Sequence, residues 1–290
     1  LIDQAKKCSA ILSEADDKID SAVLSNAGQL RVVANRAIGL DNIDVPAATE
    51  KGILVGNTPG ILHESCADFT FGLILDVARN LSYSNKQVVT GEWKFFDQTP
   101  YLGTDVHDKV LGLVGFRLIG RTVARRAWGF NMKVLYYSRT RKPEHEDSLG
   151  VQWVPDLPSL LKTSDYVSIH IPLTDQTRHY IGTQELDYMK PTGFLINTSR
   201  GGTVDSNALR EALEQGRIAG AALDVTDPEP IDPDDPLVSM KNVVVTPHIA
   251  SATAATLRSM GLMAADNIIA GLTGTPMPSC VNFDDVQLAK

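Results

Sequence analysis

Three short segments in the C-terminal half of the chain carry side chains that could act on a small carboxylic acid. An arginine can bind a carboxylate through charge-assisted hydrogen bonds, and an imidazole beside an acid can donate a proton to a carbonyl oxygen. Together, such groups could hold a 2-oxo acid and protonate its carbonyl. The segments are I-N-T-S-R-G-G with Arg200, A-L-D-V-T-D-P-E-P with Asp224 and Glu229, and V-V-V-T-P-H-I-A-S with His248.

Each of these residues also has an ordinary structural explanation when it is taken alone. Arg200 could form a surface ion pair, Glu229 lies in a turn between two prolines, and His248 could cap a helix. The chemical hypothesis therefore depends on these residues acting together. Their segments follow successive expected strands, and open α/β sheets place their sites at the carboxyl ends of strands.

A glycine-containing turn precedes these segments and could hold a dinucleotide. The apolar run Val110–Val114 is followed by G-F-R-L-I-G, from Gly115 to Gly120, and then by a helical pattern. In dinucleotide-binding proteins, such a turn presents helix N–H groups to a pyrophosphate, and its middle glycine lets the backbone approach the phosphates. Arg117 stands at that middle position, so the turn alone fits a plain strand–turn–helix equally well. We expect Arg117 to weaken the cofactor site, because a Cβ there crowds the pyrophosphate.

The next expected strand ends in Y-Y-S-R-T-R-K, where a dinucleotide-binding domain contacts the adenosine ribose. NAD-binding domains carry an Asp or Glu at this point, whereas no acid occurs here between Asp108 and Glu144. Ser138, Arg139 and Arg141 stand there instead, and guanidinium groups suit phosphate oxygens. The pattern predicts NADP(H) in preference to NAD(H), with a solvated basic loop as the alternative.

The elements that would position these residues alternate between strands and helices. Short β-branched runs separated by amphipathic segments are typical of βα units around a parallel sheet. Continuous apolar runs indicate strands covered on both faces, so we expect a doubly wound domain. The expected strands are Val110–Gly115, Lys133–Tyr137, Tyr166–Ile169, Gly193–Asn197, Ala219–Asp224 and Val243–Thr246, and the expected helices are Ile119–Trp128, Leu157–Thr163 and Ser206–Gln215.

The N-terminal part of the chain repeats this alternation more weakly. A long helix with an apolar stripe follows at about Ser65–Asn80, and another follows the last strand at about Ala254–Gly271. We therefore expect two α/β lobes joined by two long helices, with the C-terminal segment returning to the first lobe. The expected elements of the first lobe are the strands Ala10–Leu12, Arg31–Ala34 and Ile53–Gly56 and the helix Lys18–Asn26.

Composition excludes several other classes of protein. Hydrophobic residues make up 43% of the 290 residues and charged residues 21%, as in ordinary globular proteins. The 27 basic and 35 acidic residues give a formal net charge of −8, so we expect no nucleic-acid partner. Apolar runs are too short to span a bilayer and the N-terminus lacks a signal-peptide core, so we expect no membrane partner. The 3 separated cysteines predict neither a disulfide framework nor a metal site and indicate a reducing, cytoplasmic location.

Taken in order, the motifs resemble those of the D-isomer-specific 2-hydroxyacid dehydrogenases, and most of all those of glyoxylate/hydroxypyruvate reductases. The resemblance runs from about Asp16 to Asn282, which is nearly the whole chain. It implies a two-lobed α/β fold, with a Rossmann-type dinucleotide-binding domain over residues 64–251 and a smaller flavodoxin-like substrate domain over residues 1–63 and 252–290. Besides the three segments above, it rests on I-G-L-D-N-I-D, K-G-I-L-V-G-N-T-P-G and V-S-I-H-I-P-L-T.

The resemblance implies a role for each residue of the expected active site. Arg200 would bind the substrate carboxylate and help to polarise its carbonyl. His248 would protonate the carbonyl oxygen during reduction, while Glu229 would orient the imidazole and raise its pKa. Backbone N–H groups at Ile38 and Gly39 would bind the carboxylate from the other lobe.

The resemblance also implies the cofactor contacts. The amides of Leu118 and Ile119 would face the pyrophosphate. His170 and Pro172 would border the adenosine, and Thr198 would border the nicotinamide together with Asp224. The complete expected set is Gly115, Arg117, Leu118, Ile119, Gly120, Ser138, Arg139, Arg141, His170, Pro172, Thr177, Thr198, Ser199, Asp224, His248 and Ala250.

Two further expectations concern assembly and completeness. In this family the region of Trp93, Phe95 and Phe96 contributes to a homodimer, and local core packing is the alternative explanation for these aromatic residues. The family has another strand and helix before the segment that begins at Ala10, so we expect the first lobe to be incomplete.

The sequence leaves the substrate open. The leading hypothesis is NADPH-dependent reduction of glyoxylate or hydroxypyruvate to a D-2-hydroxy acid. The same fold would also suit another D-2-hydroxyacid dehydrogenase or a phosphite dehydrogenase. A third alternative is a dinucleotide-sensing corepressor, since the C-terminal binding proteins share this fold and retain the arginine, glutamate and histidine.

Overall fold

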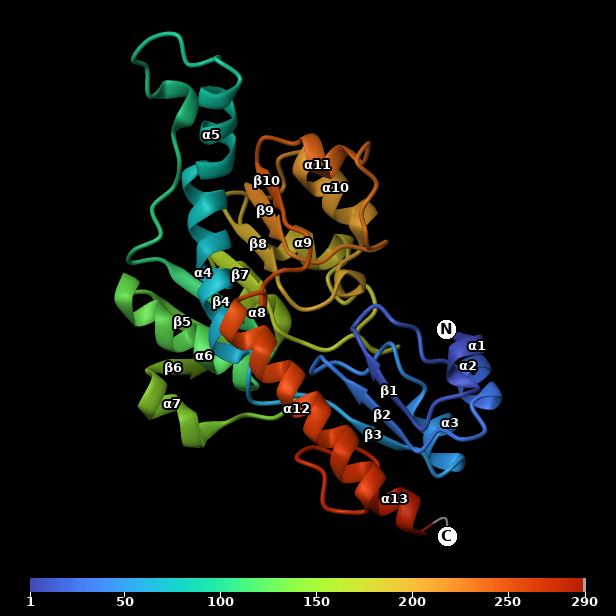
Figure 1. Cartoon of the computed structure of the whole chain (residues 1–290). Coiled ribbons are helices and arrows are strands. Elements are labelled where there is room, and N and C mark those ends of the chain that lie inside the picture. The colour runs from blue at the N-terminus through green and yellow to red at the C-terminus, as the bar shows by residue number, and fades with distance from the viewer. Residues whose placement is uncertain (289–290) are drawn as a thin grey trace. The chain divides into compact units, whose positions relative to one another are not determined.

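The computed structural model describes residues 1–288, with the side chains of residues 1–286, and it divides into two units. The large unit comprises His63–Ser251, and the small unit comprises Leu1–Leu62 together with the segment from Ala252 onward. The chain therefore passes between the units twice (Figure 1). Both units contain parallel sheets, which confirms the predicted two-lobed α/β fold class.

The large unit is built on a seven-stranded parallel sheet in the order β10-β9-β8-β7-β4-β5-β6. The chain begins in the middle at β4, runs outward through β5 and β6, and then returns to the other side of β4 as β7. This reversal is the topological switch point at which α/β sheets bind ligands. The strands are β4 Val110–Val114, β5 Lys133–Tyr137, β6 Val151–Trp153, β7 Tyr166–Ile169, β8 Phe194–Asn197, β9 Gly220–Leu223 and β10 Val243–Val245.

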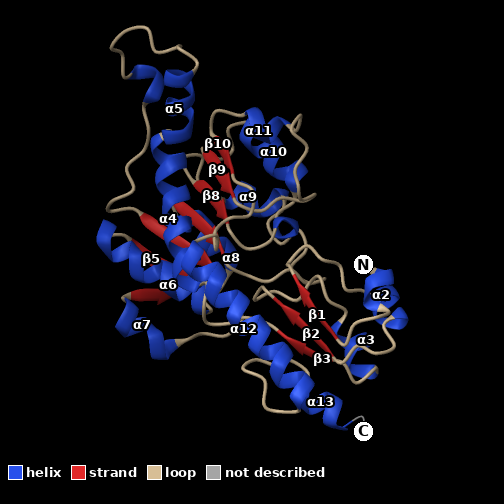
Figure 2. Cartoon of the chain, viewed as in Figure 1, coloured by secondary structure: helices blue, strands red, loops and turns tan. Residues whose placement is uncertain are grey.

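Helices cover both faces of this sheet (Figure 2). Alternate residues of one strand enter different cores: Leu111 and Leu113 pack with α4 and α6, whereas Val114 packs with α8, α9 and α10. This explains why the strands are continuously apolar in sequence. The α-helices of the large unit are α4 His63–Arg79, α5 Leu81–Val89, α6 Leu118–Ala127, α7 Pro143–Leu149, α8 Leu157–Thr163, α9 Thr183–Tyr188, α10 Ser206–Glu214 and α11 Pro236–Ser239, with 3-10 turns at Thr99–Tyr101, Trp128–Phe130 and Gly201–Thr203.

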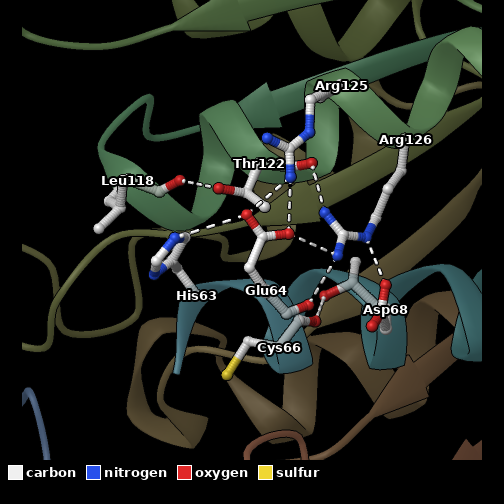
Figure 3. Close-up of polar contacts among 9 residues, drawn as sticks. His63, Glu64, Cys66, Asp68, Leu118, Thr122, Arg125 and Arg126 are labelled. Carbon is white, nitrogen blue, oxygen red and sulfur yellow. Dashed lines mark hydrogen bonds and ion pairs between the residues drawn. The ribbon is translucent and has the colours of Figure 1, made fainter. Parts of the chain in front are cut away.

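A charged cluster ties α6 to the first turns of α4 (Figure 3). Arg126 donates from Nε to Asp68 at 2.6 Å and from Nη2 to the Glu64 carboxylate at 2.8 Å. Arg125 donates to the same carboxylate at 2.6 Å. Hydrogen bonds from Arg126 and Arg125 lower the pKa of Glu64, so this carboxylate stays charged near neutral pH. The cluster fixes α6, whose first turn follows the glycine turn.

Replacing Arg126 by Met is expected to destabilise the protein more than replacing Arg125 by Met. The Arg126 side chain is 19% exposed and that of Arg125 is 52% exposed, although both contact Glu64. Loss of the packed, multiply bonded arginine should cost about 1–3 kcal/mol of unfolding free energy. Loss of the exposed arginine should cost about 0–1 kcal/mol. Urea unfolding of both variants measures the difference, and equal losses would contradict the assigned anchoring role.

The small unit is a three-stranded parallel sheet in the order β1-β2-β3, with helices around it. The long helix α12 packs against all three strands, and its Gly271 leaves no room for a Cβ beside Val32. Asn282 donates to the Ile53 carbonyl and accepts from the Val55 N–H, which fastens the C-terminal segment to β3. The elements are α1 Ile2–Ala5, β1 Ala10–Ser13, α2 Ser21–Asn26, β2 Val32–Asn35, α3 Val45–Glu50, β3 Leu54–Gly56, α12 Ala254–Thr273 and α13 Phe283–Leu288.

The structure corrects some of the predicted elements. The first predicted helix begins at Ser21 rather than Lys18, because the Asp20 carboxylate caps the N–H groups of Ala22 and Val23. The edge strand β6 and the short helix α7 were not predicted. Among residues 1–288, no helix is long and apolar enough to span a membrane.

Candidate active site

The predicted acid–base pair is formed at the carboxyl end of the sheet in the large unit. His248 follows β10, and its Nδ1 lies 2.6 Å from Oε1 of Glu229, which lies in the segment after β9. The hydrogen bond to Glu229 raises the pKa of His248, while burial opposes the rise. His248 is therefore protonated up to a higher pH than a free histidine, as a proton donor requires.

His248 is held in an unusual backbone conformation by Asp224. The φ angle of His248 is +54°, in the left-handed region that few non-glycine residues adopt. Its N–H donates to the Asp224 carbonyl at 2.8 Å, and the next two N–H groups, of Ile249 and Ala250, donate to the Asp224 carboxylate at 2.9 and 2.7 Å. Burial raises the pKa of Asp224, while these hydrogen bonds lower it. Asp224 thus fixes the position of His248 through the backbone.

Arg200 lies in a loop that its neighbours fix in place. The Asn197 side chain donates to the Arg200 carbonyl and accepts from the N–H and hydroxyl of Ser199. Gly201 packs directly on the backbone of Thr226, where any Cβ would collide. This close approach places the loop after β8 against the loop after β9. The positive charge of Arg200 lowers the pKa of His248, so the two side chains are close enough to interact.

The glycine turn has the geometry of a phosphate-binding turn. Gly115 has a φ of +98°, and a Cβ there would lie 2.5 Å from the carbonyl oxygen of His170. A Cβ on Gly120 would collide with the Gly115 carbonyl. Both glycines are therefore required where α6 meets β4 and the segment after β7. Helix α6 begins at Leu118 without a side-chain cap, which leaves its first-turn N–H groups to bind an anion.

Arg117 is accommodated without backbone strain. It precedes α6 in extended conformation, with φ −85° and ψ −162°, and its side chain is exposed. The residue therefore does not distort the turn that contains it. Its expected effect on cofactor binding stays a prediction.

Comparison with known proteins identifies the family. Residues 71–250 match the family model of the D-isomer specific 2-hydroxyacid dehydrogenase NAD binding domain. The chain is 48% identical to a glyoxylate reductase of Korarchaeum cryptofilum (strain OPF8) over 289 residues, which cover 99% of this chain and 87% of that protein. The chain belongs to the D-isomer specific 2-hydroxyacid dehydrogenase family. The predicted resemblance is confirmed.

Solved structures agree with this assignment. A protein of Thermus thermophilus matches with a TM-score of 0.90 and 41% identity, over 97% of this chain and 88% of that chain. An NADPH-dependent glyoxylate/hydroxypyruvate reductase of Sinorhizobium meliloti, solved in complex with NADP and malonate, matches with a TM-score of 0.87 and 32% identity. This match covers 97% of the present chain and 86% of the reductase chain.

The large unit is thus the NAD(P)-binding domain of a 2-hydroxyacid dehydrogenase, and its residues fit a dinucleotide. The cradle made by Gly115, Gly120 and the uncapped α6 would hold the pyrophosphate. The buried Nδ1 of His170 has no hydrogen-bond partner among the described residues, while its Nε2 lies 2.9 Å from the Ser168 hydroxyl. Burial lowers the pKa of His170 to about 4, so this ring is neutral near pH 7.

Several other predicted cofactor residues are engaged within the protein. Thr177 donates to the Pro172 carbonyl at 2.7 Å and closes the loop after β7. The Thr198 hydroxyl lies 3.1 Å from that of Thr70 on α4, a buried residue that sequence reasoning missed. Since Thr70 donates to the Cys66 carbonyl, Thr198 is the donor between the two hydroxyls. The predicted helix at about Ser65–Asn80 includes Thr70, but its apolar spacing gives no signal of this contact.

The structure changes the predicted 2′-phosphate site. Arg139 is exposed and forms no ion pair among the described residues, so its guanidinium is available to a ligand. Arg141 donates from Nε and Nη2 to Glu146 at 2.8 and 2.6 Å, a contact that the sequence did not indicate, and its predicted contact with the phosphate stays a prediction. The Ser138 hydroxyl donates to the Thr140 carbonyl. Helix α7, which was not predicted, places Glu146 against the loop that contains Arg141.

The predicted carboxylate-binding N–H groups lie in the small unit, in the loop after β2. Side-chain amides hold this loop: Asn57 donates to the Ile38 carbonyl at 2.9 Å and Asn35 donates to the Gly39 carbonyl at 2.8 Å. These bonds fix the local backbone. The substrate-binding roles of Ile38 and Gly39 stay predictions.

Proposed function

We propose that this chain is an NADPH-dependent reductase that converts glyoxylate and related small 2-oxo acids, such as hydroxypyruvate, to D-2-hydroxy acids. The observation that carries the proposal is the His248–Glu229 pair, with Arg200 close enough to influence the histidine. The names of the relatives support the substrate class: one is a glyoxylate reductase, and a solved structure is a glyoxylate/hydroxypyruvate reductase.

The residues have complementary roles in this reaction. The guanidinium of Arg200 binds the carboxylate of the oxo acid and draws electron density from the neighbouring carbonyl. Protonated His248 donates from Nδ1 to Glu229, which leaves its Nε2–H to protonate the carbonyl oxygen. Asp224 holds the backbone turn that carries the imidazole. A nicotinamide dinucleotide held at the Gly115–Gly120 turn would supply the hydride for the carbonyl carbon.

Oxidation of NADPH with a panel of 2-oxo acids tests the proposal. We expect glyoxylate and hydroxypyruvate to be the best substrates by kcat/KM. A clear preference for a larger oxo acid would instead assign another D-2-hydroxyacid dehydrogenase, and NAD(P)+ reduction by phosphite would assign a phosphite dehydrogenase. Tight dinucleotide binding without turnover of any substrate would favour the corepressor-like alternative.

Arg139 is expected to select NADPH over NADH. Its side chain is exposed at the end of β5 and forms no competing ion pair among the described residues. Changing Arg139 to Ala should cost about 1.5–3 kcal/mol of NADPH binding, the value of a hydrogen bond to a charged group. NADH binding should stay nearly unchanged. Titration of nicotinamide fluorescence measures both affinities, and equal use of the two cofactors by the wild type would contradict the preference.

Glu229 is expected to set the upper pH limit of reduction. Its hydrogen bond raises the pKa of His248, and reduction needs the protonated imidazole. Changing Glu229 to Gln removes the negative charge, so the pKa of His248 falls and reduction is lost at a lower pH than in the wild type. The pH profile of kcat for NADPH oxidation shows the shift. An unchanged upper limit would mean that another group controls this titration.

We further propose a cytoplasmic homodimer. Helix α5 has no buried residue, and the loop that follows it carries Trp93, Phe95 and Phe96 at 54%, 72% and 82% exposure. Core packing within the chain, the alternative for these aromatic residues, is therefore wrong. An exposed apolar surface of this kind is typical of an interface. Sedimentation equilibrium tests the dimer. The free thiols at Cys8, Cys66 and Cys280 support the proposed reducing, cytoplasmic location.

A further inference from the structure

One carboxylate gathers the two ends of the loop that follows β5. Glu146, on α7, accepts from Arg141 through both of its oxygens, at 2.8 and 2.6 Å. Its Oε1 also accepts from the hydroxyl of Tyr136 at 2.7 Å. Tyr136 in turn accepts from the backbone N–H of Lys142 at 2.8 Å. Glu146 therefore holds the loop from Ser138 to Lys142 in two ways. It binds the Arg141 side chain directly, and it binds the hydroxyl of Tyr136, which in turn accepts from the Lys142 N–H.

This cluster is more rigid than an ordinary surface ion pair. The Glu146 side chain is only 15% exposed, and Tyr136 is fully buried, with its ring stacked on that of Phe116 in the glycine turn. Hydrogen bonds from Arg141 and Tyr136 lower the pKa of Glu146 to about 2, so it is ionised at neutral pH. The Arg141 guanidinium also lies 5.6 Å from the Trp153 ring on the edge strand β6. Arg141 is thus held in one orientation.

The contacts of Arg141 leave part of its guanidinium unused. Glu146 takes Nε–H and one N–H of Nη2, whereas both N–H groups of Nη1 and the second of Nη2 remain. The remaining edge presents two parallel N–H donors, which is the arrangement that binds a phosphate through two oxygens. The Arg141 side chain is 55% exposed, so the residue lies at the surface, where a ligand can reach it.

We propose that Glu146 is a positioning residue for the site of the adenosine 2′-phosphate. Glu146 fixes one edge of the Arg141 guanidinium, so that the other edge binds the phosphate. The inference rests on the proposed use of NADPH, and it assigns the selection of NADPH to an acid on α7 as well as to the arginines. A carboxylate near a phosphate site normally repels the ligand. Here both oxygens are already occupied by donors, so orientation of Arg141 outweighs repulsion.

The test compares Glu146→Gln with Glu144→Gln in the full chain, by titrating nicotinamide fluorescence with NADPH and with NADH. Both substitutions remove one negative charge from α7, but Glu144 is exposed and does not contact Arg141. We expect Glu146→Gln to weaken NADPH binding about tenfold and NADH binding less than twofold, as for one misplaced charge-assisted contact. Glu144→Gln should change neither. In an Arg141→Met background, Glu146→Gln should have no further effect.

A second variant guards against misfolding. Tyr136→Phe keeps every charge but removes the hydroxyl between Glu146 and the Lys142 N–H, and it should weaken NADPH binding about two- to fivefold with little change for NADH. The inference is overturned if Glu146→Gln matches Glu144→Gln, tightens NADPH, or weakens NADH equally. The titrations contain no oxo acid and measure cofactor binding alone. Their outcome therefore does not depend on whether the enzyme reduces glyoxylate. A wild type without preference for NADPH removes both the proposed cofactor and the inference, whereas a preference that is as large in Glu146→Gln as in the wild type removes only the inference.

Discussion

Replacing His248 by Ala is expected to lower the turnover of glyoxylate by roughly 10²–10⁴-fold, the usual contribution of a general acid. The Nδ1 atom lies 2.6 Å from Glu229, and this contact is the leading cause of the raised histidine pKa. Without the imidazole, the carbonyl oxygen has no positioned proton donor. Steady-state NADPH oxidation measures the loss, and nicotinamide fluorescence checks that NADPH still binds.

The backbone at this position calls for a second variant. His248 has a φ of +54°, which alanine tolerates less well than asparagine does. His248→Asn therefore keeps the turn while removing the acid, and it should lose nearly as much turnover as His248→Ala. Near-normal turnover in either folded variant would end the assignment of His248 as the proton donor.

The strands of the large unit were largely predictable, because burial on both faces leaves a continuous apolar run. The runs Lys133–Tyr137 and Tyr166–Ile169 have the same bounds in the structure as in the prediction. The edge strand Val151–Trp153 was not found, since it is three residues long and exposes its central Gln152. The other edge strand, Val243–Val245, is equally short but was predicted, because its three valines form an unbroken apolar run.

Side-chain pairings were less predictable than the elements. Motifs gave Arg200, Glu229 and His248, yet nothing in the spacing indicates that the Asp224 carboxylate binds the backbone after His248. The acid-free stretch before Glu144 predicted a basic 2′-phosphate site with no acid in it, and a solvated basic loop was the alternative. Helix α7 then returns Glu146 to that loop, and this contact depends on a turn whose geometry is set by tertiary packing. The order of charged residues along the sequence does not show that Glu146 contacts Arg141.

Arg200 is expected to have the second largest effect on the reaction. Changing Arg200 to Gln removes the proposed carboxylate ligand, and loss of a bidentate charge-assisted pair should lower kcat/KM for glyoxylate by about 10²–10³-fold. Arg200→Lys should recover only part of this loss, because an ammonium lacks the planar pair of donors. Steady-state kinetics at saturating NADPH measure both variants.

The pH profile separates this role from a purely structural one. The positive charge of Arg200 lowers the pKa of His248, whereas the hydrogen bond from Glu229 raises it. Removing the arginine charge should therefore move the upper pH limit of kcat upward, and removing the glutamate charge should move it downward. Arg200→Lys retains the charge and should leave the limit near that of the wild type. If Arg200→Gln lowers activity without moving the upper pH limit, the charge of Arg200 does not affect His248 in the working enzyme. Carboxylate binding must then be tested separately, by the KM of a carbonyl substrate that has no carboxylate.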